Sequence, residues 1–538
     1  MNKGTTHSPI HLLGNPAENY YILGKRDKNS YSELYHQISM LCGRSTNFAK
    51  IIKTTTEISQ IFTHKKKHPN IKLIEAYAQG LETHTSNVLF NLLLPEVVAS
   101  FNKWTPDLLS LIPGCSSLFM RNNQTQDIVH TRILDYAMSG PFEKYERSII
   151  TEFPNQYKTL SYSSSGMPLP AISTMNEKGL SLALHYKHGQ YFDLEGESIF
   201  FIATEIISKC ANIREAIKYI KTQKSLSYWG LYLCDKNGEV ASIDIKGSEI
   251  IQEKFDLRDH QYLYFNNRPL LRKKGHTGIQ PYGNENQCRM RKKFIQEKIK
   301  KTTLSDKHFM LDTVKLVATP EKHKENESAR NWVSPTITPS SIQLCSFNNS
   351  KLESLFIPGS GIKYFTGEYI HHKNIFNKVE TKHITKKNIP KNNLIAGQNR
   401  LAKYQTFIDL GKIPDAYHEI QMAIELLNPF AEKHIAKFFY LVTQYIYEHD
   451  KRDLTYLFHD FERLAGKLPH YLEDHRQLFL LRLSKLIGHK ISNNSSQIKN
   501  TFLKSLYSRE YKLSPLALKG LRQLIFTRIE ILDILYMY

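Results

Sequence analysis

The chain has 538 residues, of which 41% are hydrophobic and 23% charged, so it exceeds one compact core and wholesale disorder is excluded. Its 72 Lys and Arg residues against 51 Asp and Glu residues give a formal net charge of +21, which favours anionic ligands or surfaces. No apolar run approaches the ~20 residues that cross a bilayer. The basic residues are spread along the chain and accompany no nucleic-acid-binding module, so we interpret them as solvated surface charge and expect no nucleic-acid partner.

The cysteines and the N-terminus bear on the cellular compartment. None of the six cysteines forms a CxxC pair, which argues against a disulfide scaffold and a structural zinc site and fits a reducing compartment. The N-terminus lacks a continuous apolar segment before Pro16, so a standard secretory signal is not expected. We therefore expect a cytoplasmic protein without a bound metal, with export by a non-standard route as the alternative.

Residues 1–114 are predicted to be mostly helical, because apolar residues recur at helical spacing through Ile71–Phe101. Asn102–Pro106 breaks that pattern. A short apolar stretch, Leu108–Pro113, then leads to Gly114 and Cys115.

Residues 115–370 are predicted to form an α+β domain, in which helices cover sheets of short strands. The sequence Asp235–Gly238 is typical of a hairpin turn. Two helical stretches, Ile199–Lys221 and Gln287–Lys300, interrupt the strands. The predicted strands are Ser116–Met120, Ile128–Leu134, Ser181–His185, Trp229–Cys234, Val240–Ile245, Tyr262–Phe265 and Ser341–Phe347.

Two further segments complete the chain. Residues 371–393 are rich in Lys and Asn and lack apolar periodicity, as expected of a basic, solvated linker. Residues 394–538 regain helical spacing and are predicted to form a separate all-α module. Helical arrays commonly present a surface, so this module is a candidate for contact with a protein or an anionic membrane. Its aromatic clusters, Phe438–Tyr440 and Tyr445–Tyr447, are either core or contact residues, and core is favoured because they fall inside a periodic helix.

Cys115 stands between Gly114 and Ser116 at the start of a predicted strand. Taken alone this is weak evidence for a nucleophile, because most free cysteines are small buried hydrophobes. Arg132 and Asp135 follow on the next predicted strand, where they would face opposite sides. For both to converge on one site, that strand would have to end or bulge between them.

The surrounding motifs carry a family resemblance. Residues 71–96 (IKLIEAYAQGLETHTSNVLFNLLLPE) resemble the propeptide segment of the acyl-coenzyme A:6-aminopenicillanic acid acyltransferase family. Over roughly residues 10–360, further motifs follow in the family's order, with Ser116, Thr131 and Ile133 as departures. These motifs are Gly114–Ser116, which resembles the family's Gly-Cys-Thr cleavage site, then Arg132–Asp135, Met175–Leu180, Asp235–Glu239, Phe265–Pro269 and Ala329–Trp332.

The resemblance implies a four-layer αββα sandwich of the self-processing N-terminal-nucleophile hydrolases, related to acid ceramidase, N-acylethanolamine amidase and bile-salt hydrolase. It implies cleavage between Gly114 and Cys115, which makes residues 1–114 a propeptide or small subunit. The freed α-amine has a reference pKa of about 7.7–8.0, so it can take the thiol proton and later protonate the leaving amine.

The resemblance also assigns roles to side chains. It implies that Arg132 favours the Cys115 thiolate, that Asp135 accepts from the α-ammonium, and that Asn267 donates to the oxyanion. Arg330 would neutralise Asp135 or complete the network.

Asn176 and His185 are assigned to substrate binding. Ordinary structural explanations stay open for several of the candidates. Arg132 and Asp135 could form a simple ion pair, and Asn176 and Asn267 could be turn residues.

Two functions compete. In the first, Cys115 attacks a linear amide, forms a thioester and passes the acyl group to water or to an amine, without a cofactor or with acyl-coenzyme A as co-substrate. Hydrolysis is slightly favoured, because water is always present whereas a co-substrate must be bound. In the second, the fold is catalytically idle and the C-terminal helices act as a binding or adaptor module.

Overall fold

A computed structural model describes the chain in two compact units. The first unit holds Met1–Cys42, Asn47–Pro320 and Ser334–Ile389, and the second holds Gly43–Thr46, Glu321–Val333 and Pro390–Tyr538. The described residues are 7–43, 47–66, 68–101, 114–135, 141–187, 191–270, 282–318, 336–337, 341–359, 368–385, 393–409, 411–447, 450–468, 470–489, 495–498 and 501–521.

Within these residues, the first unit contains an eight-stranded sheet with the order β1-β4-β5-β6-β7-β8-β9-β10. β1 pairs with β4 in parallel, and the other neighbours are antiparallel. Its strands are β1 Ile10–Leu13, β4 Arg147–Glu152, β5 Thr159–Ser163, β6 Ser173–Asn176, β7 Ser181–Tyr186, β8 Tyr228–Cys234, β9 Glu239–Lys246 and β10 Glu249–Asp256.

The described part of this unit also contains a seven-stranded antiparallel sheet, ordered β11-β2-β3-β12-β13-β14-β15. Its strands are β2 Gly114–Arg121, β3 Ile128–Asp135, β11 Tyr262–Phe265, β12 Ser341–Asn348, β13 Glu353–Phe356, β14 Glu368–Lys373 and β15 Glu380–Thr385.

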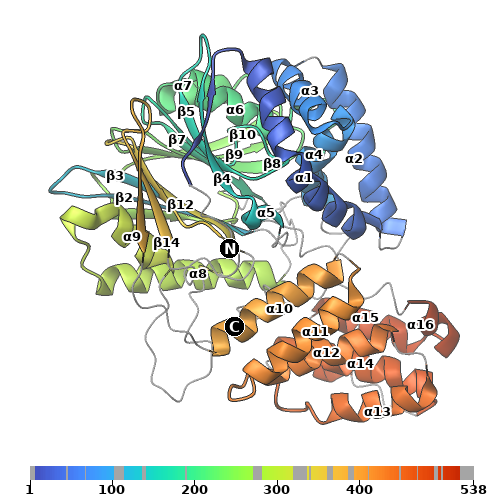
Figure 1. The fold of residues 1–538 in the computed structure, drawn as a ribbon. Helices are drawn as coiled ribbons and strands as arrows, with labels where there is room; N and C mark the ends of the chain where they lie inside the picture. The colour runs from blue at the N-terminus through green and yellow to red at the C-terminus, as the bar shows by residue number, and fades with distance from the viewer. Residues whose placement is uncertain are drawn as a thin grey trace, which may run out of the picture. The chain divides into compact units, whose positions relative to one another are not determined.

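The two sheets pack against each other. β2 contacts β7, and an apolar cluster joins Leu160 and Tyr162 of the first sheet to Phe347 and Phe356 of the second. Helices α6 and α7 contact the first sheet, and α8 and α9 contact the second (Figure 1). All residues of β3, β7 and β12 are buried, as expected of strands covered on both faces. The predicted α+β class is confirmed.

The helices of this unit largely follow the predicted pattern. The expected helix over 199–221 is two helices, because the chain turns at Cys210 and Asn212 caps the second by accepting from Glu215 N at 3.0 Å. The hairpin predicted at Asp235–Gly238 joins β8 to β9. The helices are α1 Pro16–Gly43, α2 Asn47–Lys65, α3 Pro69–Leu81, α4 Thr85–Phe101, α5 Pro141–Lys144, α6 Ile199–Lys209, α7 Ile213–Ile220, α8 Tyr282–Lys301 and α9 Phe309–Ala318, with a 3-10 turn at Asp306–His308.

One expectation about organisation needs correction. The described part of segment 1–114 is mostly helical, as predicted, and β1 adds a parallel edge strand to the first sheet. The expected linker over 371–393 contains half of β14 and all of β15, which pair with each other in the second sheet. β15 is the edge strand of that sheet, and edge strands are commonly polar or charged, so its mostly polar sequence carries no apolar pattern.

The second unit is all-helical in its described residues, as predicted for residues 394–538. Phe438, Phe439 and Tyr445 lie in its core, which confirms the core interpretation for these three residues, while Tyr447 is exposed. No helix in the described part of the chain is both long enough and apolar enough to span a bilayer. The helices are α10 Asn393–Asp409, α11 Ile413–Leu426, α12 Lys433–Tyr447, α13 Lys451–Glu462, α14 His470–Ile487, α15 Thr501–Tyr511 and α16 Pro515–Leu521, with a 3-10 turn at Ser495–Gln497.

Candidate active site

Strand alternation determines which groups meet at Cys115. In the register of β2 with β3, Cys115 lies opposite Leu134, and Ser117 lies opposite Arg132. These side chains therefore share the face of the second sheet that packs on β7. Gly114, Ser116 and Asp135 belong to the other face, toward α8.

A guanidinium group contacts the Cys115 sulfur. Arg132 Nη2 lies 3.1 Å from Cys115 Sγ and 2.6 Å from the Leu184 carbonyl oxygen, and Nη1 donates to the Ile133 carbonyl. Both Arg132 and Cys115 are fully buried. The contact places the guanidinium charge at the Cys115 sulfur, and the role predicted for Arg132 stays a prediction.

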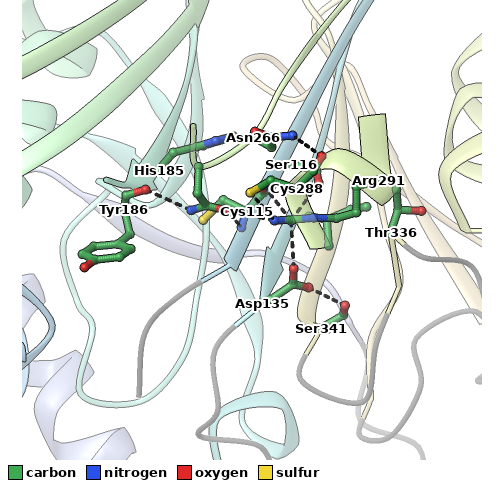
Figure 2. Close-up of polar contacts among 12 residues, drawn as sticks. Cys115, Ser116, Asp135, His185, Tyr186, Asn266, Cys288, Arg291, Thr336 and Ser341 are labelled. Atoms are coloured by element: carbon green, nitrogen blue, oxygen red, sulfur yellow. Dashed lines mark hydrogen bonds and ion pairs between the residues drawn. The ribbon is translucent and has the colours of Figure 1, made fainter. Parts of the chain in front are cut away.

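The backbone of Cys115 is held by two other side chains. Asn267 Oδ1 accepts from Cys115 N at 2.8 Å, and Arg291 Nη1 donates to the Cys115 carbonyl oxygen at 2.9 Å. Arg291 Nη2 also donates to Asn267 Oδ1 at 3.1 Å, whereas Asn267 Nδ2 donates to the Tyr186 carbonyl at 2.9 Å (Figure 2 shows this neighbourhood). The side-chain oxygen of Asn267 thus faces the Cys115 backbone. Donation from the Asn267 side-chain amide to an oxyanion stays a prediction.

Asp135 is paired on the opposite face of the sheet. Its Oδ2 lies 3.3 Å from Arg291 Nη1, and Ser341 Oγ donates to Oδ1 (Figure 2). Burial raises the pKa of Asp135, while Arg291 and the Ser341 bond oppose that rise. Arg132 and Asp135 therefore lie on opposite faces of the sheet and do not converge on one point. Arg132 contacts the Cys115 sulfur directly, whereas Asp135 is connected to the Cys115 backbone through Arg291.

The residues on either side of Cys115 are also constrained. A Cβ atom at Gly114 would lie 2.8 Å from Asp135 Oδ2 and 2.9 Å from Asp135 Cβ, so the position has no room for a side chain. Ser116 Oγ lies 2.8 Å from the Tyr264 hydroxyl and 3.2 Å from Arg291 Nη1. Close packing at Gly114 and the Ser116 hydrogen bonds thus restrain the candidate cleavage site on the sheet face toward α8.

The two predicted substrate-binding residues have different surroundings. His185 contacts Ser117, on the same sheet face as Cys115: its Nε2 is 2.8 Å from Ser117 Oγ, and burial together with Arg132 puts its pKa well below the ordinary value. Asn176 is not brought to Cys115. It donates to the carbonyls of α6's C-terminal end, at Ile207 and Cys210, and accepts from the turn before β7, which agrees with the alternative turn interpretation.

One functional side chain was missed. Arg330 lies outside the described residues, and Arg291 of α8 supplies the guanidinium that neutralises Asp135. No spacing in the sequence marks Arg291, since it is one of several basic residues in that helix. Among the residues that the structure describes, no group of three or more His, Cys, Asp or Glu side chains could hold a metal ion.

Comparison with solved structures gave several matches of low identity. They include penicillin V acylase from Agrobacterium tumefaciens (13% identity, 53% of this chain and 92% of that chain, TM-score 0.30). A Caenorhabditis elegans ortholog of N-acylethanolamine-hydrolyzing acid amidase also matches (12% identity, 44% and 93%, TM-score 0.30). A third is a mutant of conjugated bile acid hydrolase from Clostridium perfringens (11% identity, 51% and 94%, TM-score 0.27).

Sequence comparison adds a family assignment. No functionally curated protein matches the chain. Residues 123–301 match the family model of acyl-coenzyme A:6-aminopenicillanic acid acyl-transferase. The matched segment contains Arg132, Asp135, Asn267 and Arg291, and it begins after Cys115. The resemblance predicted from the motifs is therefore confirmed: across residues 123–301 this chain carries the pattern of the acyl-coenzyme A:6-aminopenicillanic acid acyl-transferase family.

Proposed function

We propose that this chain is a self-processing cysteine enzyme of the N-terminal-nucleophile type, which cleaves or transfers the acyl group of a linear amide. The observation that carries the proposal is the set of contacts made by Cys115. Its sulfur contacts Arg132, its backbone nitrogen donates to Asn267 and its carbonyl accepts from Arg291. The family match supports acyl transfer or amide hydrolysis. The two packed sheets with helices against each support the four-layer αββα architecture.

Self-processing begins with attack of Cys115 Sγ on the carbonyl carbon of Gly114. The carbon–nitrogen bond breaks, the Cys115 nitrogen takes the thiol proton, and Gly114 is left as a thioester on Sγ. Water then hydrolyses that thioester, which gives a Gly114 carboxylate, a free thiol and an α-amine on Cys115. Asn267 Oδ1, already 2.8 Å from that nitrogen, is suited to hold the new amine by accepting from it.

Turnover uses the same atoms on a substrate. The α-amine takes the thiol proton, Sγ attacks the amide carbonyl, and the protonated amine returns its proton to the leaving nitrogen. The positive charge of Arg291, at the Cys115 carbonyl, disfavours the ammonium form and so keeps the amine available as a base. Asn267 Nδ2 is anchored on the Tyr186 carbonyl, which fixes the direction of the proposed oxyanion donor; one such donor is worth about 3 kcal/mol.

The proposed substrate joins an acyl chain to a small amine or amino acid. A formal charge of +21 suits an anionic substrate or an acyl-coenzyme A donor. Hydrolysis is the favoured outcome, because water is always available to the thioester. The second unit is proposed to recruit a protein or an anionic membrane, since it contains none of the catalytic candidates.

Mass spectrometry of the purified protein tests the processing step. We expect fragments of 114 and 424 residues, and a single intact chain for Cys115→Ala. Cys234→Ala is the matched control, because Cys234 is also fully buried in a strand of this unit and should leave cleavage unchanged. Cleavage at Gly114 in Cys115→Ala contradicts the mechanism.

Incubation with N-acyl amino acids and N-acyl amines tests turnover. We expect Cys115-dependent release of free acid, and an acyl-coenzyme A arm with added amine distinguishes transfer from hydrolysis. An intact wild-type chain that turns over nothing across this panel favours the binding or adaptor alternative.

A further inference from the structure

A buried lysine lies beside the turn that carries Asn267. Lys187 directly follows β7, and its ammonium pairs with Asp244 of β9 at 3.3 Å, with both side chains fully buried. Burying an ion pair has a large desolvation cost, and replacing such a pair by apolar residues is often neutral or stabilising. Stability alone therefore does not explain a charge at this position.

The ammonium group holds the peptide groups on both sides of Asn267. Lys187 Nζ lies 2.7 Å from the Arg268 carbonyl oxygen and 3.4 Å from the Asn266 carbonyl oxygen. The Tyr232 hydroxyl accepts from Nζ and lies 3.3 Å from the same Asn266 oxygen, to which it donates. Lys187 therefore holds the backbone carbonyls of the residues before and after Asn267, which restrains the orientation of Asn267.

Other contacts extend the same support. Asp244 Oδ2 accepts from Leu270 N at 2.9 Å, so the carboxylate that pairs with Lys187 also holds the far end of the turn. A Cβ atom at Gly230 of β8 would lie 2.3 Å from Lys187 Cε, so this glycine leaves the space that the lysine crosses. Tyr186, the residue before Lys187, accepts from Asn267 Nδ2 at 2.9 Å. The end of β7 and its partners thus fix Asn267 through both its backbone and its side chain.

We propose that Lys187 is a positioning residue, which holds the 266–270 turn so that Asn267 stays aligned with the Cys115 nitrogen. The inference rests on the proposed function. Lys187 acts through Asn267 and has no contact with the Cys115 side chain among the bonds described. We therefore expect that replacing Lys187 affects the reaction by displacing Asn267.

The test removes both charges at once with Lys187→Met/Asp244→Asn, which leaves no unpaired buried ion. We expect self-cleavage and kcat for an N-acyl amino acid to fall roughly 10- to 100-fold, with KM nearly unchanged, because displacing a catalytic group by about 1 Å has that effect. In an Asn267→Ala background the same pair of changes should cause no further loss, as expected when one residue acts through another. The control is Arg482→Met/Glu510→Gln, which removes a buried ion pair of the second unit and should leave both rates unchanged.

The outcomes separate the two proposals. A wild-type chain that neither cleaves nor turns over ends the proposed function, and this inference falls with it. An active wild type with unchanged rates in the folded Lys187→Met/Asp244→Asn variant, or with a loss that adds fully to Asn267→Ala, overturns this inference alone. If that variant does not fold, Tyr232→Phe decides: a several-fold loss of kcat that vanishes in the Asn267→Ala background supports the role, and an unchanged kcat overturns it.

Discussion

Replacement of Arg291 by Met should lower the free energy of unfolding, because Arg291 connects α8 to several groups of the candidate site. The guanidinium of Arg291 is fully buried and donates to the Cys115 carbonyl, to Asn267 Oδ1 and to Asp135. Its removal leaves the buried Asp135 carboxylate with the hydrogen bond from the Ser341 hydroxyl and the charge of Arg132, and without a directly paired cation among the described residues. Breaking a buried pair by removing one partner costs about 3–5 kcal/mol, so we expect a loss of that size in the free energy of unfolding.

The pH dependence of this loss follows from the direction of the Asp135 pKa. Burial already raises that pKa, and removal of Arg291 takes away the charge that opposes the rise. A raised folded-state pKa means that the folded protein binds the proton more tightly than the unfolded chain, so stability is lost as pH rises through it. The deficit of Arg291→Met should therefore be largest at alkaline pH and shrink as the pH falls and Asp135 takes a proton.

Urea unfolding in a Cys115→Ala background measures this without interference from cleavage. Trp229 is buried in β8 of the first unit, so its fluorescence reports on the unfolding of that unit. Arg289→Met is the matched control, because Arg289 is an exposed residue of the same helix. Asp135→Asn in the Arg291→Met background should recover much of the loss. Equal stability of Arg291→Met and its parent at about pH 8 would refute the reasoning.

Three further predictions follow from other contacts. Gly114→Ala should slow self-cleavage on a denaturing gel, because the added Cβ would lie within 2.9 Å of Asp135 atoms; wild-type kinetics would count against the close approach. Burial raises the pKa of Glu96 on α4 to about 7 despite bonds from Ser198 and Ser227, so the processed protein should lose thermal stability as pH rises through about 7, and Glu96→Gln should flatten that dependence. A chain ending at Asn392 should fold and cleave at the wild-type rate, because the first unit ends at Ile389; an insoluble or uncleaved product would show that the helices complete its core.

Several of the strands that sequence reasoning found have buried apolar runs. β3, β8 and β12 are covered on both faces and rich in apolar residues, so their sequences alone mark them. Half of β14 and all of β15 were predicted as a linker; for β15, the position at the sheet edge relaxes the demand for an apolar pattern. Edge strands depend on a partner that is distant in sequence, which no local pattern reveals.

The site residues likewise divide into those with a signal in the local sequence and those without one. Cys115, Arg132 and Asn267 could be selected because the order of short motifs resembled a family, and the structure brings them together. Arg291 could not be selected, because its role depends on how α8 packs over β2 rather than on its neighbours in sequence. Asn176 differs from these residues: its motif is compatible with both a turn and a site, and its described bonds are those of a turn, so its role in substrate binding stays a prediction.

The parallel pairing of β1 with β4 has a consequence for assembly. If the chain is cut after Gly114, one strand of the first sheet and four helices belong to a different polypeptide from the other strands. The mature protein would then be a two-chain heterodimer whose sheet crosses the subunit boundary through backbone hydrogen bonds. Its refolding would become bimolecular and concentration-dependent, whereas the uncut precursor folds with both parts tethered. Cleavage would thus come after folding, and a denatured mature enzyme would recover far less readily than its precursor.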